Sequence, residues 1–150
     1  PTQDRSSAAS DVYKRQVNPD VDRVIWAKVS FNCAMNSLCA LLGTTPGPVL
    51  DSAELRDLAI ATAMESCDVA AAIGIEVDRD GLLKTLELVQ REHRHHKPSM
   101  LVDFLAGRRT EIESLNGAVA ALGGVHGVPT PRIQTLLALV RAHESQYGRS

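Results

Sequence analysis

The stretch WAKVSFNCAMN at residues 26–36 decides the fold predicted for this chain. It contains no Pro or Gly and is apolar on most sides, which predicts a helix buried in a core. Lys28, Asn32 and Asn36 follow at i, i+4 and i+8, so their side chains form one polar stripe along that helix. This stripe could be the solvent edge of an amphipathic helix. Asn is a poor helix former, however, and a buried lysine beside two amides indicates a functional site.

The composition around this stretch is that of one globular domain. With 150 residues, the chain is long enough for a single core and too short to predict two domains. The net charge is −2 and no basic face carries interleaved aromatics, which argues against a nucleic-acid partner. No apolar run reaches membrane-spanning length and no signal peptide is recognisable, so we expect a cytoplasmic protein without a membrane partner.

Three cysteines, Cys33, Cys39 and Cys67, lie in apolar helical sequence. Their number is odd, and the first two are six residues apart on different helix faces, which favours neither a local disulfide nor a metal pair. We therefore expect buried free thiols in a reducing cytoplasm and no bound metal.

Helical periodicity continues through most of the chain, and no stretch shows the alternation of a strand. We therefore predict an all-α bundle. The breakers at 43–48 predict a loop, and Gly123-Gly124 is predicted to interrupt a helix. The predicted helices cover, in order, about 20–42, 51–74, 80–93, 99–106, 110–122 and a last segment from 131 onward.

Local signals mark several helix starts. Asp51, three residues before Glu54, predicts a capping box, and Thr110 before Glu113 predicts a second one. Thr130 is the predicted N-cap of the last helix, because a proline follows it at the first helical position.

Residues 1–16 do not resemble an evolved protein sequence. The segment SSAASDVYKRQ at 6–16 resembles a one-frame translation of a transposon adapter used to prepare sequencing libraries. A natural polar tail would share its composition. We exclude 1–16 from the fold reasoning and predict one helical domain over 17–150, which begins inside a longer gene.

The polar stripe offers the first candidate chemistry. A lysine desolvated in a cleft has a lowered pKa, which would suit Lys28 to donate a proton to a developing alkoxide near neutral pH. The amides of Asn32 and Asn36 offer both donors and acceptors, which suits recognition of hydroxyl or carbonyl groups.

Two further polar groups follow later in the chain. Ser99 in PSMLVD, at 98–103, is either a helix N-cap or a hydroxyl that helps to hold a carboxylate. In RRTEIESLNG, at 108–117, a capping role accounts for Glu113, whereas Glu111 is placed to hydrogen-bond a hydroxyl or a cofactor amide. Asn116 with the following glycine indicates close packing against a neighbouring helix.

A histidine cluster, EHRHHK at 92–97, invites a metal interpretation. His93 and His96 could share a helix face, but no convincing third and fourth ligand completes a site. We favour a solvated helix terminus, where cations suit the helix dipole. The cluster directly precedes Ser99 and could add positive potential for an anionic substrate.

Four motifs together resemble one known family. They are W-x-K-x-x-x-N-x-x-x-N, P-S-M-L-x-D, R-R-T-E-I-x-x-L-N-G and G-V-P-T-P, which start at residues 26, 98, 108 and 127. In this order and at compatible spacing, over 17–147, they resemble the C-terminal domain of ketopantoate reductase (2-dehydropantoate 2-reductase). The resemblance implies a helical domain of the 6-phosphogluconate-dehydrogenase-like type behind an N-terminal Rossmann domain. It also implies reduction of ketopantoate to pantoate with NADPH, in the biosynthesis of pantothenate and coenzyme A.

The resemblance also implies residue roles. Lys28 matches the catalytic lysine that protonates the ketone oxygen as hydride arrives. Asn32, Asn36 and Ser99 match substrate-contacting residues, and Glu111 matches the glutamate at the junction of substrate and nicotinamide, a cofactor-binding position. The implied partners are a small 2-oxo acid and the chain's own Rossmann domain, and a homodimer is left open.

Departures from the family pattern leave the acid substrate open. Val102 stands where Gln is frequent, Arg132 where Asn is common, and 43–48 holds no Asn. A related reductase for another 2-oxo acid therefore stays an alternative. No G-x-G-x-x-G occurs in the chain, so we expect NADPH to bind mainly to the missing domain and the chain alone to be inactive. The rival interpretation is a non-catalytic helical interaction or dimerisation domain.

Overall fold

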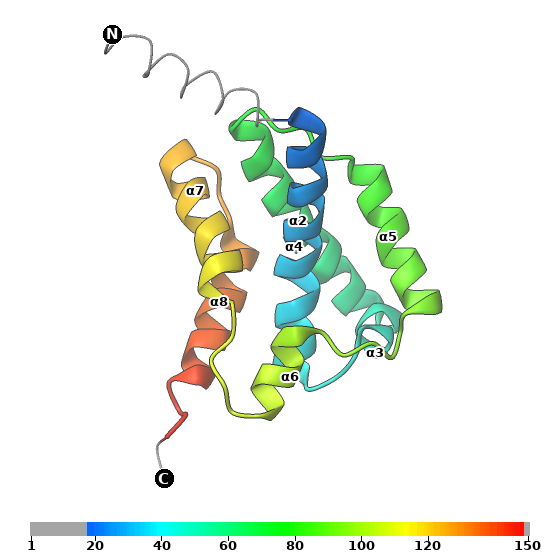
Figure 1. Cartoon of the computed structure of the whole chain (residues 1–150), viewed down its shortest axis with the longest axis vertical. Coiled ribbons are helices and arrows are strands. Elements are labelled where there is room, and N and C mark those ends of the chain that lie inside the picture. The colour runs from blue at the N-terminus through cyan, green and yellow to red at the C-terminus, as the bar shows by residue number, and fades with distance from the viewer. Residues whose placement is uncertain (1–17, 149–150) are drawn as a thin grey trace, which may run out of the picture.

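The computed structural model describes residues 18–148, and the predicted adapter segment at 1–16 lies outside this range. Helices and turns account for its regular structure, and no strand occurs between 18 and 148, so the all-α prediction is confirmed. Figure 1 shows α2 and α4 in the middle of the bundle, with α3 and α5 to one side and α7 and α8 to the other.

The central helix is α2, Pro19–Leu42, as the sequence predicts. Asn18 caps its start by accepting a hydrogen bond from the backbone N–H of Asp20 at 3.0 Å, and Gly43 ends it at a φ of 63°. Residues 33–40 are all buried because α4, α6 and α8 pack around them. By length and composition alone α2 could span a membrane, but half of its most apolar window is buried inside the bundle.

A short helix, α3 (Pro46–Asp51), occupies part of the predicted loop at 43–48. The loop prediction is wrong here because prolines are compatible with the first turn of a helix, whose N–H groups need no intrahelical acceptor. The next helix, α4 (Ala53–Ala72), is capped by Ser52, whose Oγ accepts from the N–H of Leu55 at 3.4 Å. The prediction that Asp51 caps this helix is wrong, because the Asp51 carboxylate pairs with Arg94 instead.

Two helices follow α4 in the chain. Helix α5, Arg79–Glu92, starts at Asp78, which caps Gly81, and it buries Leu82 and Leu86. Helix α6, Ser99–Leu105, follows after a connection at 93–98 and packs against α2. Both agree with the predicted ranges to within a residue.

The segment after Thr110 is less regular than predicted. It forms a π-helical turn, η1 (Glu113–Gly117), which continues directly into α7 (Ala118–His126). The predicted interruption at Gly123-Gly124 is wrong, since both lie inside α7. Gly123 is required there for another reason: a Cβ would lie 2.8 Å from the backbone oxygen of Val128, so the next loop packs directly on this helix.

The predicted capping box at Thr110 is only half present. The Oγ1 of Thr110 accepts from the backbone N–H of Ile112 at 3.3 Å. Glu113 does not reach back to Thr110, because both of its oxygens pair with Arg141 on α8, at 2.5 and 2.7 Å. That pair lowers the pKa of Glu113.

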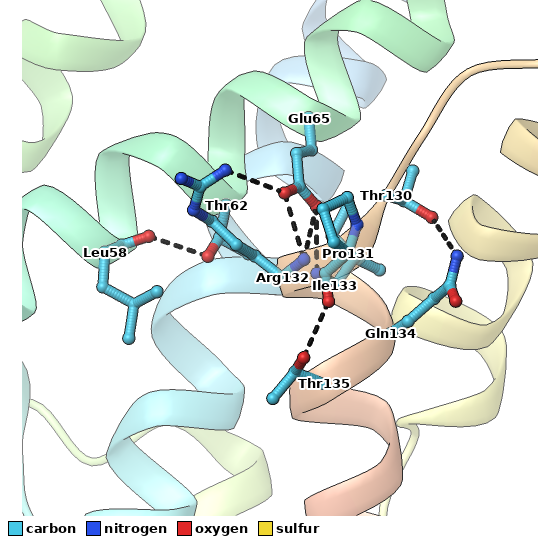
Figure 2. Close-up of polar contacts among 9 residues, drawn as sticks. All are labelled: Leu58, Thr62, Glu65, Thr130, Pro131, Arg132, Ile133, Gln134 and Thr135. Atoms are coloured by element: carbon cyan, nitrogen blue, oxygen red, sulfur yellow. Dashed lines mark hydrogen bonds and ion pairs between the residues drawn. The ribbon is translucent and has the colours of Figure 1, made fainter.

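The last helix, α8 (Pro131–Glu144), begins at a carboxylate from another helix (Figure 2). Thr130 holds the N-cap position, as predicted, but its side chain makes no capping bond. Glu65 on α4 accepts instead from the backbone N–H groups of Arg132 and Ile133, each at 3.0 Å, and pairs with the Arg132 guanidinium at 3.2 Å. A buried acid therefore joins α4 to α8.

The core consists of a main cluster of apolar side chains from α2, α3, α4, α5 and α8, and of two smaller clusters, one shared by α2, α6 and α8 and the other by α2, α4, α7 and α8. Cys33, Cys39 and Cys67 are buried in it as free thiols, as predicted. Burial raises the pKa of Cys33 and Cys39 to about 12, so both are protonated at neutral pH and serve as packing groups.

Candidate functional site

A cavity of about 620 Å³ lies beside the polar stripe of α2. It is bordered by α2, the start of α3, the end of α5, the 93–98 connection, the start of α6 and the segment before η1. All five residues that the sequence proposes as site residues line it. Its lining is Lys28, Phe31, Asn32, Met35, Asn36, Pro46, Val89, His93, His96, Pro98, Ser99 and Glu111.

The polar stripe runs along α2 from an exposed residue to a buried one. Lys28 is exposed, Asn32 is half-buried and Asn36 is 6% exposed. The expectation of a buried Lys28 is wrong, because the N-terminal half of α2 is partly uncovered and Val24 nearby is 70% exposed. With a rise of about 1.5 Å per residue, Lys28 and Asn36 stand about 12 Å apart along the helix.

Glu111 brings three of the predicted residues into contact. Its Oε1 accepts from the Nδ2 of Asn36 at 3.4 Å and from the Oγ of Ser99 at 3.3 Å. Ser99 is the first residue of α6 and makes no capping bond, so the N-cap alternative for Ser99 is wrong. Side chains from α2, α6 and the segment before η1 thus meet at one carboxylate.

The π-helical turn fixes the position of Glu111. Asn116, which is fully buried in η1, donates from Nδ2 to the backbone oxygen of Cys33 on α2 at 3.2 Å. On the other side of Glu111, Thr110 donates from its N–H and its hydroxyl to Glu144, at 2.7 and 2.6 Å. The segment is therefore held against both α2 and α8. The predicted close packing at Asn116 is confirmed, and π-turns often occur beside functional sites.

One wall of the cavity is apolar, and sequence reasoning missed most of it. Phe31 and Met35 lie on α2 next to the polar stripe, and their spacing of four residues was a usable signal. Pro46 on α3 and Val89 on α5 carry no local signal, because only the tertiary arrangement brings them to α2. Of the departures from the family pattern, Val102 and Arg132 do not line the cavity, whereas the 43–48 segment borders it through Pro46.

Charges are unevenly distributed around the cavity. Lys28, His93 and His96 line it together with one acid, Glu111. Between residues 18 and 148, no three His, Cys, Asp or Glu side chains are close enough together to hold a metal ion.

A second, more apolar cavity of about 750 Å³ lies toward the start of α2. Lys28 and Phe31 border both cavities, so Lys28 stands between them. Glu76, Val77 and Leu82 contribute to the far wall of the second cavity.

Comparison with known proteins identifies the family. Residues 20–144 match the family described as ketopantoate reductase PanE/ApbA C-terminal. The 2-dehydropantoate 2-reductase of Archaeoglobus fulgidus is 36% identical over 126 residues, which are 84% of this chain and 42% of that protein. The enzyme of the same name from Pyrobaculum aerophilum is 32% identical over 126 residues, 84% of this chain and 45% of that protein. The chain thus spans less than half the length of these relatives.

Solved structures agree with this assignment. The putative 2-dehydropantoate 2-reductase from Enterococcus faecalis superposes with a TM-score of 0.83 at 25% identity, over 97% of this chain and 49% of that one. D-mandelate dehydrogenase, solved with NADH and anilino(oxo)acetate, superposes with a TM-score of 0.78 at 30% identity, over 83% of this chain and 41% of that one. The chain belongs to the ketopantoate reductase family and carries its C-terminal helical domain.

Proposed function

We propose that this chain is the substrate-binding part of a cytoplasmic, NADPH-dependent 2-dehydropantoate 2-reductase, with Lys28 as the proton donor. One observation carries the proposal: five residues named from three separate sequence motifs border a single cavity, namely Lys28, Asn32, Asn36, Ser99 and Glu111. The named relatives are 2-dehydropantoate 2-reductases, and the buried free thiols fit a reducing compartment.

The reaction assigns a separate task to each part of the stripe. NADPH supplies the hydride that adds to the ketone carbon, and the carbonyl oxygen becomes negative as this bond forms. The ammonium of Lys28 stabilises that charge and transfers its proton to the oxygen, which yields the alcohol. The amides of Asn32 and Asn36 orient the substrate's oxygens.

Glu111 fits the edge of a nicotinamide site. Its Oε1 takes the bonds from Asn36 and Ser99, whereas its Oε2 makes no hydrogen bond to any residue between 18 and 148. A free carboxylate oxygen at the rim of the cavity suits the N–H₂ of a carboxamide. The remaining cofactor contacts belong to the chain's own Rossmann domain, which is the proposed partner.

A domain exchange tests this function. Residues 18–148 replace the matching C-terminal part of the A. fulgidus enzyme, and NADPH oxidation with ketopantoate is followed by absorbance. We expect ketopantoate-dependent turnover by the hybrid and none by the 150-residue chain alone. A folded hybrid that binds NADPH but does not reduce ketopantoate would contradict the proposal.

The acid itself has a specific alternative. Phe31, Met35 and Val89 form an apolar wall, and D-mandelate dehydrogenase is a structural neighbour at 30% identity. A 2-oxo acid with a bulky apolar side chain is therefore the second candidate substrate. Comparing kcat/KM of the hybrid for ketopantoate and for phenylglyoxylate distinguishes the two.

A non-catalytic role has one supporting observation. Val21, Val24 and Ile25 on α2 are 50%, 70% and 51% exposed, an apolar face suited to another domain or a second copy. If this chain serves only as an interaction domain, substitutions at this face should change its oligomeric state, whereas Lys28→Ala should change no measured property.

A further inference from the structure

We propose that Glu144, the last residue of α8, is a positioning residue that keeps Glu111 within hydrogen-bond distance of Asn36 and Ser99. Glu144 does not line the cavity, so it acts through the backbone on either side of Glu111. Its effect on turnover rests on the proposed function, whereas its effect on the position of Glu111 does not.

The contacts of Glu111 leave little tolerance for movement. Its Oε1 accepts from Asn36 at 3.4 Å and from Ser99 at 3.3 Å, both at the long end of the hydrogen-bond range. A displacement of about half an ångström away from these donors would break both bonds. The Glu111 side chain is exposed, so packing around it does not fix its position. The backbone has to fix it instead.

The backbone before Glu111 takes its hydrogen-bond acceptor from a distant helix. Residues 108–110 belong to no helix, so the N–H of Thr110 has no helical acceptor in a preceding turn and needs one from elsewhere in the fold. Glu144 supplies it, because its Oε1 accepts from this N–H at 2.7 Å.

The same carboxylate oxygen also reaches the residue after Glu111. The hydroxyl of Thr110 donates to Glu144 Oε1 at 2.6 Å and accepts from the N–H of Ile112 at 3.3 Å. The N–H groups on both sides of Glu111 are thus tied to one oxygen, directly at residue 110 and through a hydroxyl at residue 112. Bonds to an ionised acceptor are among the stronger hydrogen bonds. Glu144 is itself held in place, because Val140 one turn earlier on α8 is fully buried.

The two ends of this segment depend on different contacts. At the downstream end, Ile112 is fully buried and Asn116 donates to α2, and neither contact involves Glu144. At the upstream end, the preceding anchor is an ion pair between Arg108 and Asp103, in which the arginine is 60% exposed. A surface pair of this kind contributes little. The upstream end is therefore fixed mainly by Glu144.

NMR of the Asn36 side-chain amide tests the inference on the 150-residue chain. Its Nδ2 donates to Glu111, so its chemical shifts report whether Glu111 is in place. We expect Glu144→Ala to move these shifts toward their values in Glu111→Ala. Glu144→Gln keeps an acceptor for Thr110 and should leave the shifts as they are in wild type.

Glu113→Ala is the matched control. Glu113 pairs with Arg141, so this variant removes another polar link to α8 and keeps both bonds of Thr110. It should leave the Asn36 shifts unchanged.

A second variant covers the case in which Glu144→Ala does not fold. Thr110→Val removes the hydroxyl but keeps the N–H bond, so it should move the Asn36 shifts in the same direction and to a smaller extent. Wild-type shifts in folded Glu144→Ala, or in Thr110→Val if Glu144→Ala is unfolded, would overturn the inference. Equal movement in Glu113→Ala would overturn it as well.

The hybrid reductase separates this inference from the proposed function. Glu144→Ala should lower kcat/KM for ketopantoate by about tenfold, and it should cause almost no further loss in a hybrid that already carries Glu111→Ala. Losses that multiply in the double variant would contradict the positioning role. A folded hybrid that binds NADPH without ketopantoate turnover refutes the proposed function alone, because the Asn36 shifts still decide whether Glu144 positions Glu111.

Discussion

Replacing Glu65 by Ala should destabilise the bundle more than any single surface change. The Glu65 side chain is 8% exposed, and its two oxygens cap α8 through the backbone N–H groups of Arg132 and Ile133 (Figure 2). Without the carboxylate, these N–H groups lose their acceptors at a junction where water has little access. The start of α8, which buries Ile133, would then have to fray or remain unsatisfied.

The expected magnitude follows from the bonds that are lost. A hydrogen bond to a charged group contributes about 1.5–3 kcal/mol, and removing one partner of a buried charged pair costs about 3–5 kcal/mol. We expect Glu65→Ala to lower the free energy of unfolding by about 3–5 kcal/mol, a large part of the roughly 5–15 kcal/mol typical of a domain. Glu65→Gln keeps one acceptor and should cost about 1–2 kcal/mol.

Two controls separate capping from the surface ion pair. Arg132→Ala removes a guanidinium that is 51% exposed but keeps the backbone N–H bond, so it should cost at most about 1 kcal/mol. Glu87→Ala, on the exposed face of α5, should have almost no effect. Denaturant unfolding followed by circular dichroism measures the free energy of unfolding of each variant. The reasoning is refuted if Glu65→Ala and Arg132→Ala are equally destabilising.

Three further predictions concern other parts of the bundle. Gly123→Ala should destabilise the domain by about 1–3 kcal/mol, since the added Cβ would lie 2.8 Å from the Val128 oxygen. Gly124→Ala, with open space around it, should be neutral or stabilising, and equal melting temperatures of the two variants would contradict this. The Asp51–Arg94 pair lowers the aspartate pKa to about 2, so its contribution is present above the unfolded value near 3.9 and is lost as pH falls through about 2. The melting-temperature difference between wild type and Asp51→Asn should therefore be constant from about pH 7 to 5 and shrink toward pH 2, and a difference that grows in acid would be inconsistent with the pair. The two thiols whose pKa burial raises to about 12 should not react with a thiol reagent at neutral pH until the protein is unfolded; rapid labelling of the native state would contradict their burial.

Sequence reasoning predicted elements whose signals are local. The range of α2 follows from an unbroken apolar pattern between Asn18 and Gly43, and α5 and α6 follow from periodicity and breakers. The predicted loop before α4 failed because prolines in a first helical turn look like breakers in a one-dimensional reading.

Caps supplied by distant residues could not be predicted. Glu65 caps α8 from 67 residues away, and Glu113 pairs with Arg141 from 28 residues away. A capping-box pattern describes only neighbours in the sequence, so it named Glu113 for a bond that a tertiary partner takes. The prediction that Lys28 is buried failed for a similar reason, since the neighbouring helices leave that end of α2 uncovered.

The candidate site also has a part that local sequence signals predict and a part that only the tertiary structure creates. Its polar half was accessible from motif spacing, because Lys28, Asn32 and Asn36 share one helix face. Its other half depends on the hydrogen bond and the ion pair that join α3 to the 93–98 connection, and these have no signature in the sequence of either segment. Pro46 and His96 become neighbours of one cavity only after the bundle has assembled.

The central claim, that Lys28 donates the proton, is tested most directly by kcat of the hybrid reductase carrying Lys28→Ala. We expect kcat to fall by roughly 100- to 10,000-fold, with the melting temperature unchanged because Lys28 is exposed. Lys28→Arg keeps the charge but holds its proton too tightly to donate it, so it should also be slow. Lys84→Ala, at an exposed position on α5, is the matched control. A Lys28→Ala hybrid that turns over as fast as the unaltered hybrid would contradict the account.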